Sequence, residues 1–439
     1  MKNNGLTKNL LICGDNLSAL DDLIKKGIKV DLIYLDPPFF SNKHYEVVWG
    51  DEAEVRSFKD RWAGGISVYI EWMRERIAKM YDVLKDTGSF YLHCDSHASH
   101  YLKVMLDDVF GHKNFLNEII WKRRTNTVKA ITRSFSVNND SIFIYIKSKD
   151  YCFKIPYEDY PPEYYKRFKY TDKKGRYRWQ VMATYSQKRL EQLKRENRIR
   201  QGKNAKYPEF KQYLSELKGI PISNIWTDIN MINAAAKERL GYPTQKPEVL
   251  LERIIRASSN KDDIVLDPFC GCGTAMAVAH RLNRKWIGID ISPTAIVLIE
   301  KRLNKFGTVK SKDFDVIGMP TTLSHLRKLE PFEFQNWVIN EMHAKQSKKL
   351  SSDFGLDGYY DRTIFTDKAG IQVKQSENVG RNVVDNFETA LSRGKFTKGF
   401  IVAFSFSKGA NEEAARVKGE GLEIRLIKVE DLLLGKVKI

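Results

Sequence analysis

The segment VDLIYLDPPFF, residues 30–40, contains side chains whose types and order could do chemistry. Its apolar, β-branched run predicts a buried strand that ends at Asp36. Two consecutive prolines and two phenylalanines follow, and a strand needs none of them in order to stop. A carboxylate, a turn made rigid by proline and an aromatic ring therefore stand in succession, which predicts a site at the end of this strand.

A second segment, DPFCGCGT at residues 267–274, lies between a predicted strand and a predicted helix. Its glycines let the backbone approach a ligand without obstruction by a Cβ atom. Asp290 ends the next predicted strand about twenty residues later, where a carboxylate can accept hydrogen bonds from ribose hydroxyls. The spacing is neither that of NAD sites nor that of the NTPase phosphate loop. The segment predicts a nucleotide-cofactor site of another kind.

The cysteines and the apolar runs bound the class of protein. Cys270 and Cys272 have no second Cys or His pair at zinc spacing nearby, so small residues in a tight turn are favoured over a metal site. The five cysteines are odd in number and scattered, which indicates a reducing compartment without a disulfide framework. No apolar run reaches the length of a membrane span, and the first residues lack the features of a signal peptide. We expect an intracellular protein with no membrane partner.

The formal net charge of +18 indicates a polyanionic partner. Residues 120–240 carry 27 Lys and Arg against 12 Asp and Glu, with aromatic residues interleaved. This mixture can bind phosphates and lie against bases, which predicts a nucleic acid as the partner. A solvated basic face is the alternative. The candidate DNA-contacting residues are Lys122, Arg123, Arg124, Lys166, Arg167, Lys169, Arg176 and Arg178.

The elements that position these residues follow an α/β pattern. Strands alternate with helices on both sides of an irregular, basic stretch, which predicts a doubly wound, mostly parallel sheet interrupted by an insertion. Asn16 is the expected cap of the first helix, at residues 16–27. A separate α/β pattern begins after residue 330. The expected divisions are 1–150, the insertion 151–242, a cofactor-binding part 243–308, a linker 309–330 and a last domain 331–439.

Residues 10–306 resemble the amino-directed DNA methyltransferases. LDPPF resembles their catalytic motif and DPFCGCGT their S-adenosylmethionine loop, while ICGDNLSAL and PTQKPEVLLERII resemble two further motifs. The order matches the β-type arrangement, a permuted methyltransferase fold in which the insertion between the two halves recognises the target. The resemblance implies four catalytic residues, Asp36, Pro37, Pro38 and Phe39. It also implies a cofactor site of Asp15, Gln245, Lys246, Pro247, Asp267, Pro268, Phe269, Gly271, Gly273, Thr274 and Asp290.

The implied reaction explains why the strand ends in DPPF. An exocyclic base amine is a poor nucleophile because its lone pair is delocalised into the ring. Acceptors at Asp36 and at the Pro37 carbonyl would take its two N–H bonds, while Phe39 stacks on a flipped-out base. The absence of a Pro-Cys dipeptide argues against carbon-5 methylation. In this family a leading Asp goes more often with adenine N6 than with cytosine N4, so adenine is favoured.

Two other interpretations of these motifs stay open. Asp36 could cap the following turn while Phe39 and Phe40 lie in the core. The chain could also be a DNA-binding assembly factor that keeps the fold without chemistry. As a methyltransferase of a restriction–modification system, it would be a cytoplasmic, nucleoid-associated protein of a prokaryote or a phage. Its partner would be double-stranded DNA, and a homodimer is one expected state.

The last domain resembles the PD-(D/E)xK nuclease fold, in the Gln-x-Lys variant of Mrr-like restriction endonucleases. Asp357 falls on one expected strand, and alternation puts Gln372 and Lys374 on one face of the next. With Glu341 on the leading helix, these residues could hold Mg²⁺ and activate water for phosphodiester cleavage. The alternatives are the solvent side of an amphipathic strand and a clamp or dimerisation module that does not cut.

Overall fold

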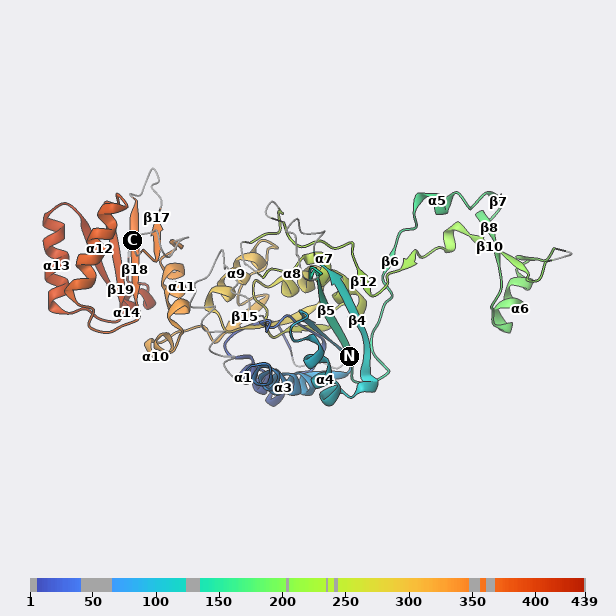
Figure 1. Ribbon diagram of the computed structural model, residues 1–439, viewed down its shortest axis with the longest axis horizontal. Coiled ribbons are helices and arrows are strands. Elements are labelled where there is room, and N and C mark those ends of the chain that lie inside the picture. The colour runs from blue at the N-terminus through green and yellow to red at the C-terminus, as the bar shows by residue number, and fades with distance from the viewer. Residues whose placement is uncertain are drawn as a thin grey trace. The chain divides into compact units, whose positions relative to one another are not determined.

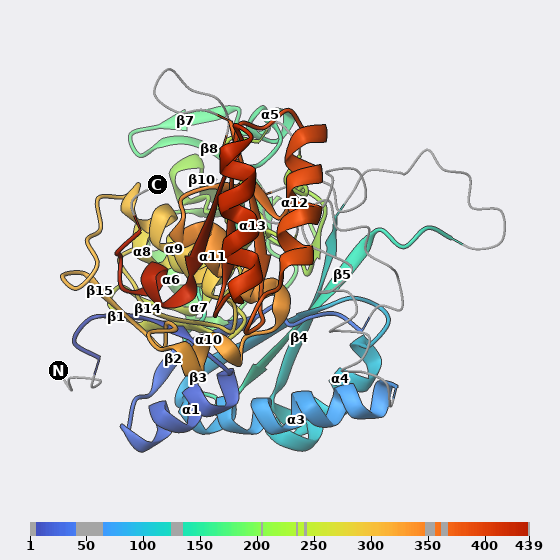
Figure 2. The same ribbon diagram turned by 90° about the vertical axis from the view of Figure 1, so that its left-hand side faces the viewer.

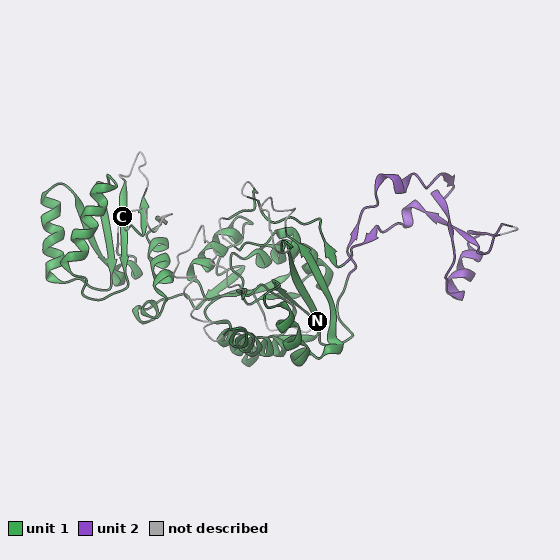
Figure 3. Cartoon of the chain, in the orientation of Figure 1, with its two compact units in different colours: residues 1–153, 224–439 green, residues 154–223 purple. Residues whose placement is uncertain are grey.

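The computed structural model describes residues 6–40, 65–123, 135–202, 205–233, 236–240, 244–346, 356–360 and 368–437 (Figure 1). The chain divides into two compact units (Figure 3). Unit 1 comprises residues 1–153 and 224–439, and unit 2 comprises residues 154–223. Within the described ranges, every helix is too short or too polar to cross a membrane.

A nine-stranded sheet forms the centre of unit 1, in the order β12-β4-β5-β3-β2-β13-β14-β1-β15. Only β5 runs antiparallel to its two neighbours, β3 and β4, which confirms the prediction of a mostly parallel sheet. The strands are β1 (Asn9–Cys13), β2 (Val30–Leu35), β3 (Leu84–Cys94), β4 (Phe115–Lys122), β5 (Asn139–Ile146), β12 (Ile225–Trp226), β13 (Ile264–Asp267), β14 (Lys285–Asp290) and β15 (Phe314–Ile317).

Helices cover both faces of this sheet (Figures 1 and 2). On one face lie α1 (Asn16–Lys25), α3 (Ile66–Val83) and α4 (Ser99–Phe110), whose apolar sides form one continuous core with the strands. Leu20, Met73 and Leu106 are fully buried there. The other face carries α7 (Glu248–Ser258), α8 (Thr274–Arg281) and α9 (Pro293–Asn304). The sheet is thus doubly wound, as predicted.

Strand β2 lies beside β13, although more than 220 residues separate them along the chain. Ile33 pairs with Leu266, and Leu266 pairs with Ile287 of β14 on its other side. Strand β14 in turn pairs with β1, where Cys13 lies opposite Asp290. All four strands are parallel, so their carboxyl ends meet at one edge of the sheet, where open α/β sheets bind their ligands.

Three boundaries differ from the expected ones. Asp15, not Asn16, caps α1, because its carboxylate reaches the N–H groups of the first turn. The range 309–330 is not a plain linker: it contains β15, which extends the sheet beside β1, and α10 (Leu323–Arg327). The insertion is shorter than 151–242, because β12 returns to pair with β4 at Ile120 and Trp121.

Unit 2 has its own small antiparallel sheet, in the order β7-β8-β10-β9. Its strands are β7 (Tyr170–Asp172), β8 (Gly175–Val181), β9 (Ile199–Arg200) and β10 (Glu209–Tyr213). A two-stranded ribbon of β6 (Tyr157–Glu158) and β11 (Ile220–Pro221) and two helices, α5 (Pro162–Tyr165) and α6 (Gln187–Arg195), complete it.

The C-terminal domain has a five-stranded sheet in the order β16-β17-β18-β19-β20. The strands are β16 (Lys345–Gln346), β17 (Gly358–Tyr360), β18 (Ala369–Lys374), β19 (Lys398–Ala403) and β20 (Glu423–Lys428). One face packs against α11 (Pro331–Glu341) and α14 (Val429–Leu433), the other against α12 (Arg381–Arg393) and α13 (Lys408–Gly419). Helix α13 had not been predicted, since few apolar residues mark its buried side.

Candidate active site

Asp36 follows β2 directly and forms an ion pair with Lys246, which stands two residues before α7. The contact joins the Lys246 Nζ to Asp36 Oδ2, and the two side chains are only 14% and 15% exposed. The other carboxylate oxygen, Oδ1, is buried and accepts no hydrogen bond from any described residue. Leaving a buried polar atom without a hydrogen-bond partner costs free energy. We therefore interpret Oδ1 as an acceptor for a hydrogen-bond donor of a ligand.

Phe39 presents its ring beside this carboxylate. The Lys246 Nζ lies 5.1 Å from the centroid of the Phe39 ring. The ring centroid of His93, on the neighbouring strand β3, lies 6.0 Å from that of Phe39. Phe40, by contrast, packs against Tyr69 in the core, at 5.7 Å between ring centroids. The alternative interpretation places both phenylalanines in the core. Phe40 fits it, whereas Phe39 does not.

A buried hydrogen-bonded network supports the end of β2. The Tyr34 hydroxyl and His93 Nδ1 are 3.0 Å apart, and His93 Nε2 lies 3.0 Å from Asp140 Oδ2. Arg123 Nε is 3.2 Å from the other Asp140 oxygen. Burial acts to raise the pKa of Asp140, but the hydrogen bond from His93 and the positive charges nearby outweigh it and leave that pKa below its ordinary value. Arg123, expected to contact DNA, is thus part of this network.

His93 and Asp140 had not been predicted as site residues from the sequence. Both are almost fully buried, at 0% and 1% exposure. The available signal was a histidine at the end of the otherwise apolar strand SFYLHCD, but a lone His on a strand does not reveal its partner. Only the antiparallel pairing of β3 with β5 brings the two side chains together.

Asp290 is held by two backbone donors at the end of β14. The N–H of Gly271 donates to Oδ2 at 2.8 Å, and the N–H of Ser292 donates to Oδ1 at 2.9 Å. Burial raises the pKa of Asp290 to about 6, against the opposite effect of these two hydrogen bonds. No cation in the described part of the chain pairs with it. A carboxylate that is held by backbone N–H groups and has no cationic partner can bind neutral hydroxyl groups as hydrogen-bond donors.

Asp267 closes the turn that begins the glycine loop. Its Oδ1 accepts a hydrogen bond from the Phe269 N–H at 3.1 Å, and the residue is 4% exposed. Burial raises the pKa of Asp267 well above its ordinary value, and the charges of Asp36 and Asp290 raise it further. The charges of Asp36 and Asp290 therefore both act on the carboxyl group of Asp267.

Glycines shape the loop at two positions. Gly273 precedes α8 with φ of 74°, and a Cβ atom there would lie 2.7 Å from the Ile299 side chain. Gly14, at the end of β1, has φ of 157°, and a Cβ atom there would meet nothing within 4 Å. A side chain is thus excluded at Gly273 by Ile299, whereas the space beside Gly14 is open.

Two buried arginines hold the surrounding segments. Arg76 of α3 donates to Asp15 Oδ1 at 2.9 Å and to Asn16 Oδ1 at 2.7 Å, and the Asn16 amide donates to the Pro268 carbonyl at 3.0 Å. Asp15 also caps α1, and its side chain stays 43% exposed. Arg76 had not been predicted, because its partners stand at the start of α1, 60 and 61 residues earlier in the chain.

Arg302 of α9 ties the glycine loop to the start of α7. It donates to the Cys272 carbonyl at 3.1 Å and to Glu248 Oε1 at 2.6 Å.

The Thr274 hydroxyl donates to the Lys246 carbonyl at 3.3 Å, and Pro247 caps α7. Gln245 bonds instead to the backbone of Glu238 and Leu240. Lys246 thus keeps its backbone at the cofactor loop while its side chain reaches Asp36.

The basic residues of unit 2 fall into two groups. Lys166, Arg167, Lys169 and Arg176 are exposed, although Arg176 also donates to a backbone carbonyl. Arg178 differs from the prediction: it is 8% exposed, bonded to Gln212 at 2.8 Å and covered by the rings of Tyr164 and Phe168, so it supports this small fold. Lys122 is exposed on β4 of unit 1, and Arg124 lies outside the described residues.

The C-terminal domain brings three of its predicted residues together. Asp357 Oδ2 accepts a hydrogen bond from the Val373 N–H at 2.6 Å, which puts Asp357 beside Gln372 and Lys374. The pairing of Gly358 with Ile371 in the neighbouring strands fixes this register. Glu341 ends α11, and burial raises its pKa. Gln372 is buried at 9% exposure.

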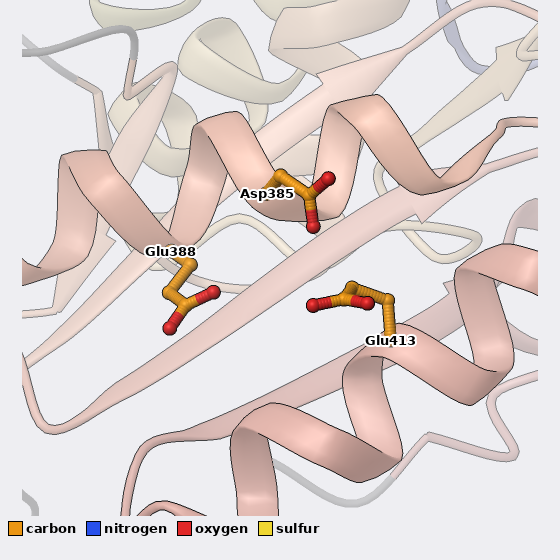
Figure 4. A group of neighbouring side chains, drawn as sticks. All are labelled: Asp385, Glu388 and Glu413. Atoms are coloured by element: carbon orange, nitrogen blue, oxygen red, sulfur yellow. The ribbon is translucent and has the colours of Figure 1, made fainter.

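Another acidic group, Asp385, Glu388 and Glu413, lies on α12 and α13 with oxygens within 4.8 Å of one another (Figure 4). Arg381 pairs with Glu413 at 2.8 Å, and Arg416 pairs with Glu388 at 2.7 Å. These ion pairs account for the cluster without a metal ion, and it contains none of the residues predicted for cleavage.

Comparison with known proteins gives two families. Residues 30–301 match the family described as DNA methylase, and residues 326–434 match the family described as restriction endonuclease. The type II methyltransferase M.EcaI of Enterobacter cloacae is 31% identical, over 67% of this chain and 69% of that protein. The type II methyltransferase M.HpaI of Haemophilus parainfluenzae is 28% identical, over 78% and 94%. The DNA adenine methyltransferase YhdJ of Escherichia coli K12 is 29% identical, over 67% and 82%.

The buried network yields a test of stability. Replacing Asp140 by Asn leaves His93 and Arg123 without their carboxylate, so we expect the free energy of unfolding at pH 7 to fall by about 3 kcal/mol. Because the pKa of Asp140 is lowered by folding, the wild type keeps this stabilisation above about pH 4 and loses it as the pH falls through the lowered pKa. Urea unfolding followed by tryptophan fluorescence between pH 7 and pH 3 measures both effects.

The control for this test is Asp108→Asn, which removes an exposed partner of Arg74. We expect it to cost less than about 1 kcal/mol. Equal destabilisation by the two substitutions at every pH would contradict the assigned role of the network.

Proposed function

The chain belongs to the DNA methylase family, and from this membership we propose that it methylates the N6 amine of an adenine flipped out of double-stranded DNA, with S-adenosylmethionine as methyl donor. The single observation that carries the proposal is the unpartnered, buried Oδ1 of Asp36 at the end of β2. This strand is the direct neighbour of β13, which leads into the glycine loop. An acceptor for a base amine and a loop suited to a nucleotide cofactor thus share one edge of the sheet.

The residues of the DPPF turn activate the amine. Asp36 Oδ1 and the Pro37 carbonyl accept the two N–H bonds, which draws the nitrogen towards a tetrahedral form and exposes its lone pair. Phe39 holds the base by stacking, and the prolines keep the carbonyl in place. The donor supplies an electrophilic methyl group: the N–C bond forms, the C–S bond breaks and its electron pair stays on sulfur. The amine then releases one proton, for which Asp36 is the nearest acceptor.

The cofactor half of the site fits a nucleoside. Asp290 is a partly buried carboxylate without a cationic partner among the described residues, which suits ribose hydroxyls. The open side of Gly14 leaves room in front of the strand ends. Asp15 keeps an exposed carboxylate edge for the adenine amine, whereas Asp267 serves by closing the loop.

Adenine is proposed over cytosine on two grounds. The catalytic motif begins with Asp36, which goes more often with adenine in this family, and one relative is named as a DNA adenine methyltransferase. Sequencing of methylated positions in a random DNA library distinguishes N6-methyladenine from N4-methylcytosine and gives the recognition site.

The exposed basic residues of unit 2 are proposed to contact DNA phosphates: Lys166, Arg167, Lys169 and Arg176. Acting on cellular DNA, the enzyme would work in the prokaryotic cytoplasm.

A second activity is proposed for the C-terminal domain, because residues 326–434 match the restriction endonuclease family and Asp357 lies beside Gln372 and Lys374. Oxygens of Asp357 and Gln372, with Glu341, would hold Mg²⁺, and Lys374 would stabilise the attacking water. The water oxygen bonds to phosphorus as the bond to the leaving oxygen of the sugar breaks. Gln372 offers a neutral oxygen, so the metal would be held less tightly than by two carboxylates.

The methyltransferase proposal is tested by Asp36→Ala. We expect methyl transfer from radiolabelled S-adenosylmethionine to mixed DNA to fall by about 10³-fold, because the amine loses its charged acceptor. Cofactor affinity should stay within about twofold of wild type, which also reports on folding. Asp86→Ala, which removes an exposed carboxylate, should retain full activity. Transfer to no DNA by the wild type would favour a non-catalytic DNA-binding protein.

The pKa of Asp290 predicts how cofactor binding depends on pH. Ribose hydroxyls bind the ionised carboxylate best, and burial raises the pKa of Asp290 to about 6 in the free protein. Protonation therefore competes with binding below about pH 6, and we expect affinity to fall by up to about tenfold per pH unit there. Isothermal titration calorimetry from pH 5 to pH 7 measures this. Asp290→Asn should bind more weakly at pH 7 and lack the decline, and an equal decline in both proteins would contradict the assignment.

Cleavage is tested with supercoiled DNA and Mg²⁺. We expect nicking by the wild type and by Asp36→Ala, and a loss of at least about 10²-fold in Lys374→Ala, because the attacking water loses its cation. Lys408→Ala removes a 92% exposed lysine of the same domain and should cut normally. Nicking by Lys374→Ala at the wild-type rate would exclude this site. Failure of the wild type to cut either methylated or unmethylated DNA would instead favour a DNA clamp.

A further inference from the structure

We propose that Lys246 is a placeholder for the target base: in the DNA-free enzyme its ammonium, bound to Asp36 Oδ2, stands beside Phe39 where the base enters, and it withdraws when the base amine binds at Oδ1. This inference rests on the proposed methyltransferase function and adds to it. The resemblance to methyltransferases implied only a cofactor role for Lys246.

The position of the ammonium carries the argument. The Lys246 Nζ contacts Asp36 Oδ2 and lies 5.1 Å from the centroid of the Phe39 ring. These are the carboxylate that accepts the amine and the ring that stacks on the base in the proposed reaction. A lysine ammonium carries N–H donors and binds to aromatic faces, so it satisfies both groups as a base amine would. The side chain is only 14% exposed, so its neighbours enclose most of it.

The charge of Lys246 explains why the free enzyme needs an occupant. Asp36, Asp140 and Asp267 are all buried or nearly so, and Lys246 interacts electrostatically with the latter two as well as contacting the first. Without Lys246, Asp36 would lose its ion-pair partner, and its charge would lie near Asp267 in a medium of low dielectric constant, which is unfavourable. Lys246 therefore stabilises the empty site.

The same charge supplies a means of release. The methyl group must reach an amine held by the same carboxylate that Nζ contacts, so the positive sulfonium of the donor must bind close to the ammonium. Two cations close to one carboxylate repel each other. This repulsion is stronger than the interaction of either cation with a neutral group. The backbone of Lys246 is held by Thr274, but four rotatable side-chain bonds let the ammonium swing towards solvent. A cationic cofactor thus prepares the pocket for the base.

The test measures base flipping with a mapped recognition duplex that carries 2-aminopurine next to the target adenine. Saturating enzyme and no cofactor are used, so DNA affinity does not enter. Lys246→Met keeps the length of the side chain without the charge, and we expect the ratio of flipped to stacked base to rise about fivefold. Lys246→Arg, which can still pair with Asp36, should behave as wild type. Lys261→Met removes an exposed ammonium before β13, at the opposite end of the strand, and should change nothing.

A second measurement uses the wild type alone. Sinefungin, which carries an amine in place of the sulfonium, should raise the flipped fraction more than neutral S-adenosylhomocysteine does at equal saturation. In Lys246→Met this difference should vanish. If Lys246→Met does not fold, Lys246→Gln replaces it, and the wild-type comparison stands by itself.

The outcomes separate the proposals. Unchanged flipping in Lys246→Met together with weaker cofactor binding would overturn the placeholder and make Lys246 a cofactor ligand. Equal effects of the two cofactor analogues on the wild type would overturn it as well. If the wild type methylates no DNA and flips no base, the proposed function itself fails, which is a different result from either of these.

Discussion

The parallel pairing of β2 with β13 is the constraint on which the site depends. These strands are far apart in the chain, and each ends in an Asp-Pro turn at the same edge of the sheet. Because the register sets Ile33 against Leu266, Asp36 and the loop after Asp267 have a fixed separation. Neighbouring β14 and β1 bring Asp290 and Asp15 to the same edge. A shift of register by one residue would turn the side chains of β2 to the opposite face and separate the motifs.

Buried charge at this edge is balanced in two ways. Asp290 and Asp267 rely on backbone N–H groups and have raised pKa values because burial disfavours their ionised forms. Asp36 and Asp140 instead have cations beside them, Lys246 and Arg123. The first pair suits neutral hydroxyl donors or a structural role, and the second is held in ion pairs. This division suits the proposed site, which would bind a nucleoside on one side and polarise an amine on the other.

Each part of the chain has its own sheet and its own core. Unit 2 builds a small antiparallel sheet in which a buried arginine, Arg178, packs among aromatic rings, while its other basic side chains stay exposed. The C-terminal domain packs helices on both faces of a separate sheet. The proposed recognition, methyl transfer and cleavage would therefore require no shared core, so a substitution that tests one of them leaves the packing of the other parts intact.

The sequence by itself determined the local features: the α/β class, the strands that end at Asp36 and Asp267, and the motifs that identify the family. These depend on periodicity and on turn residues, which act over a few positions. It could not reveal His93 with Asp140, Arg76 with Asp15, or Lys246 with Asp36, because these partners lie 47, 61 and 210 residues apart. Nor did it reveal β15 or the burial of Arg178. Such contacts depend on strand order and side-chain packing, which only the tertiary structure decides.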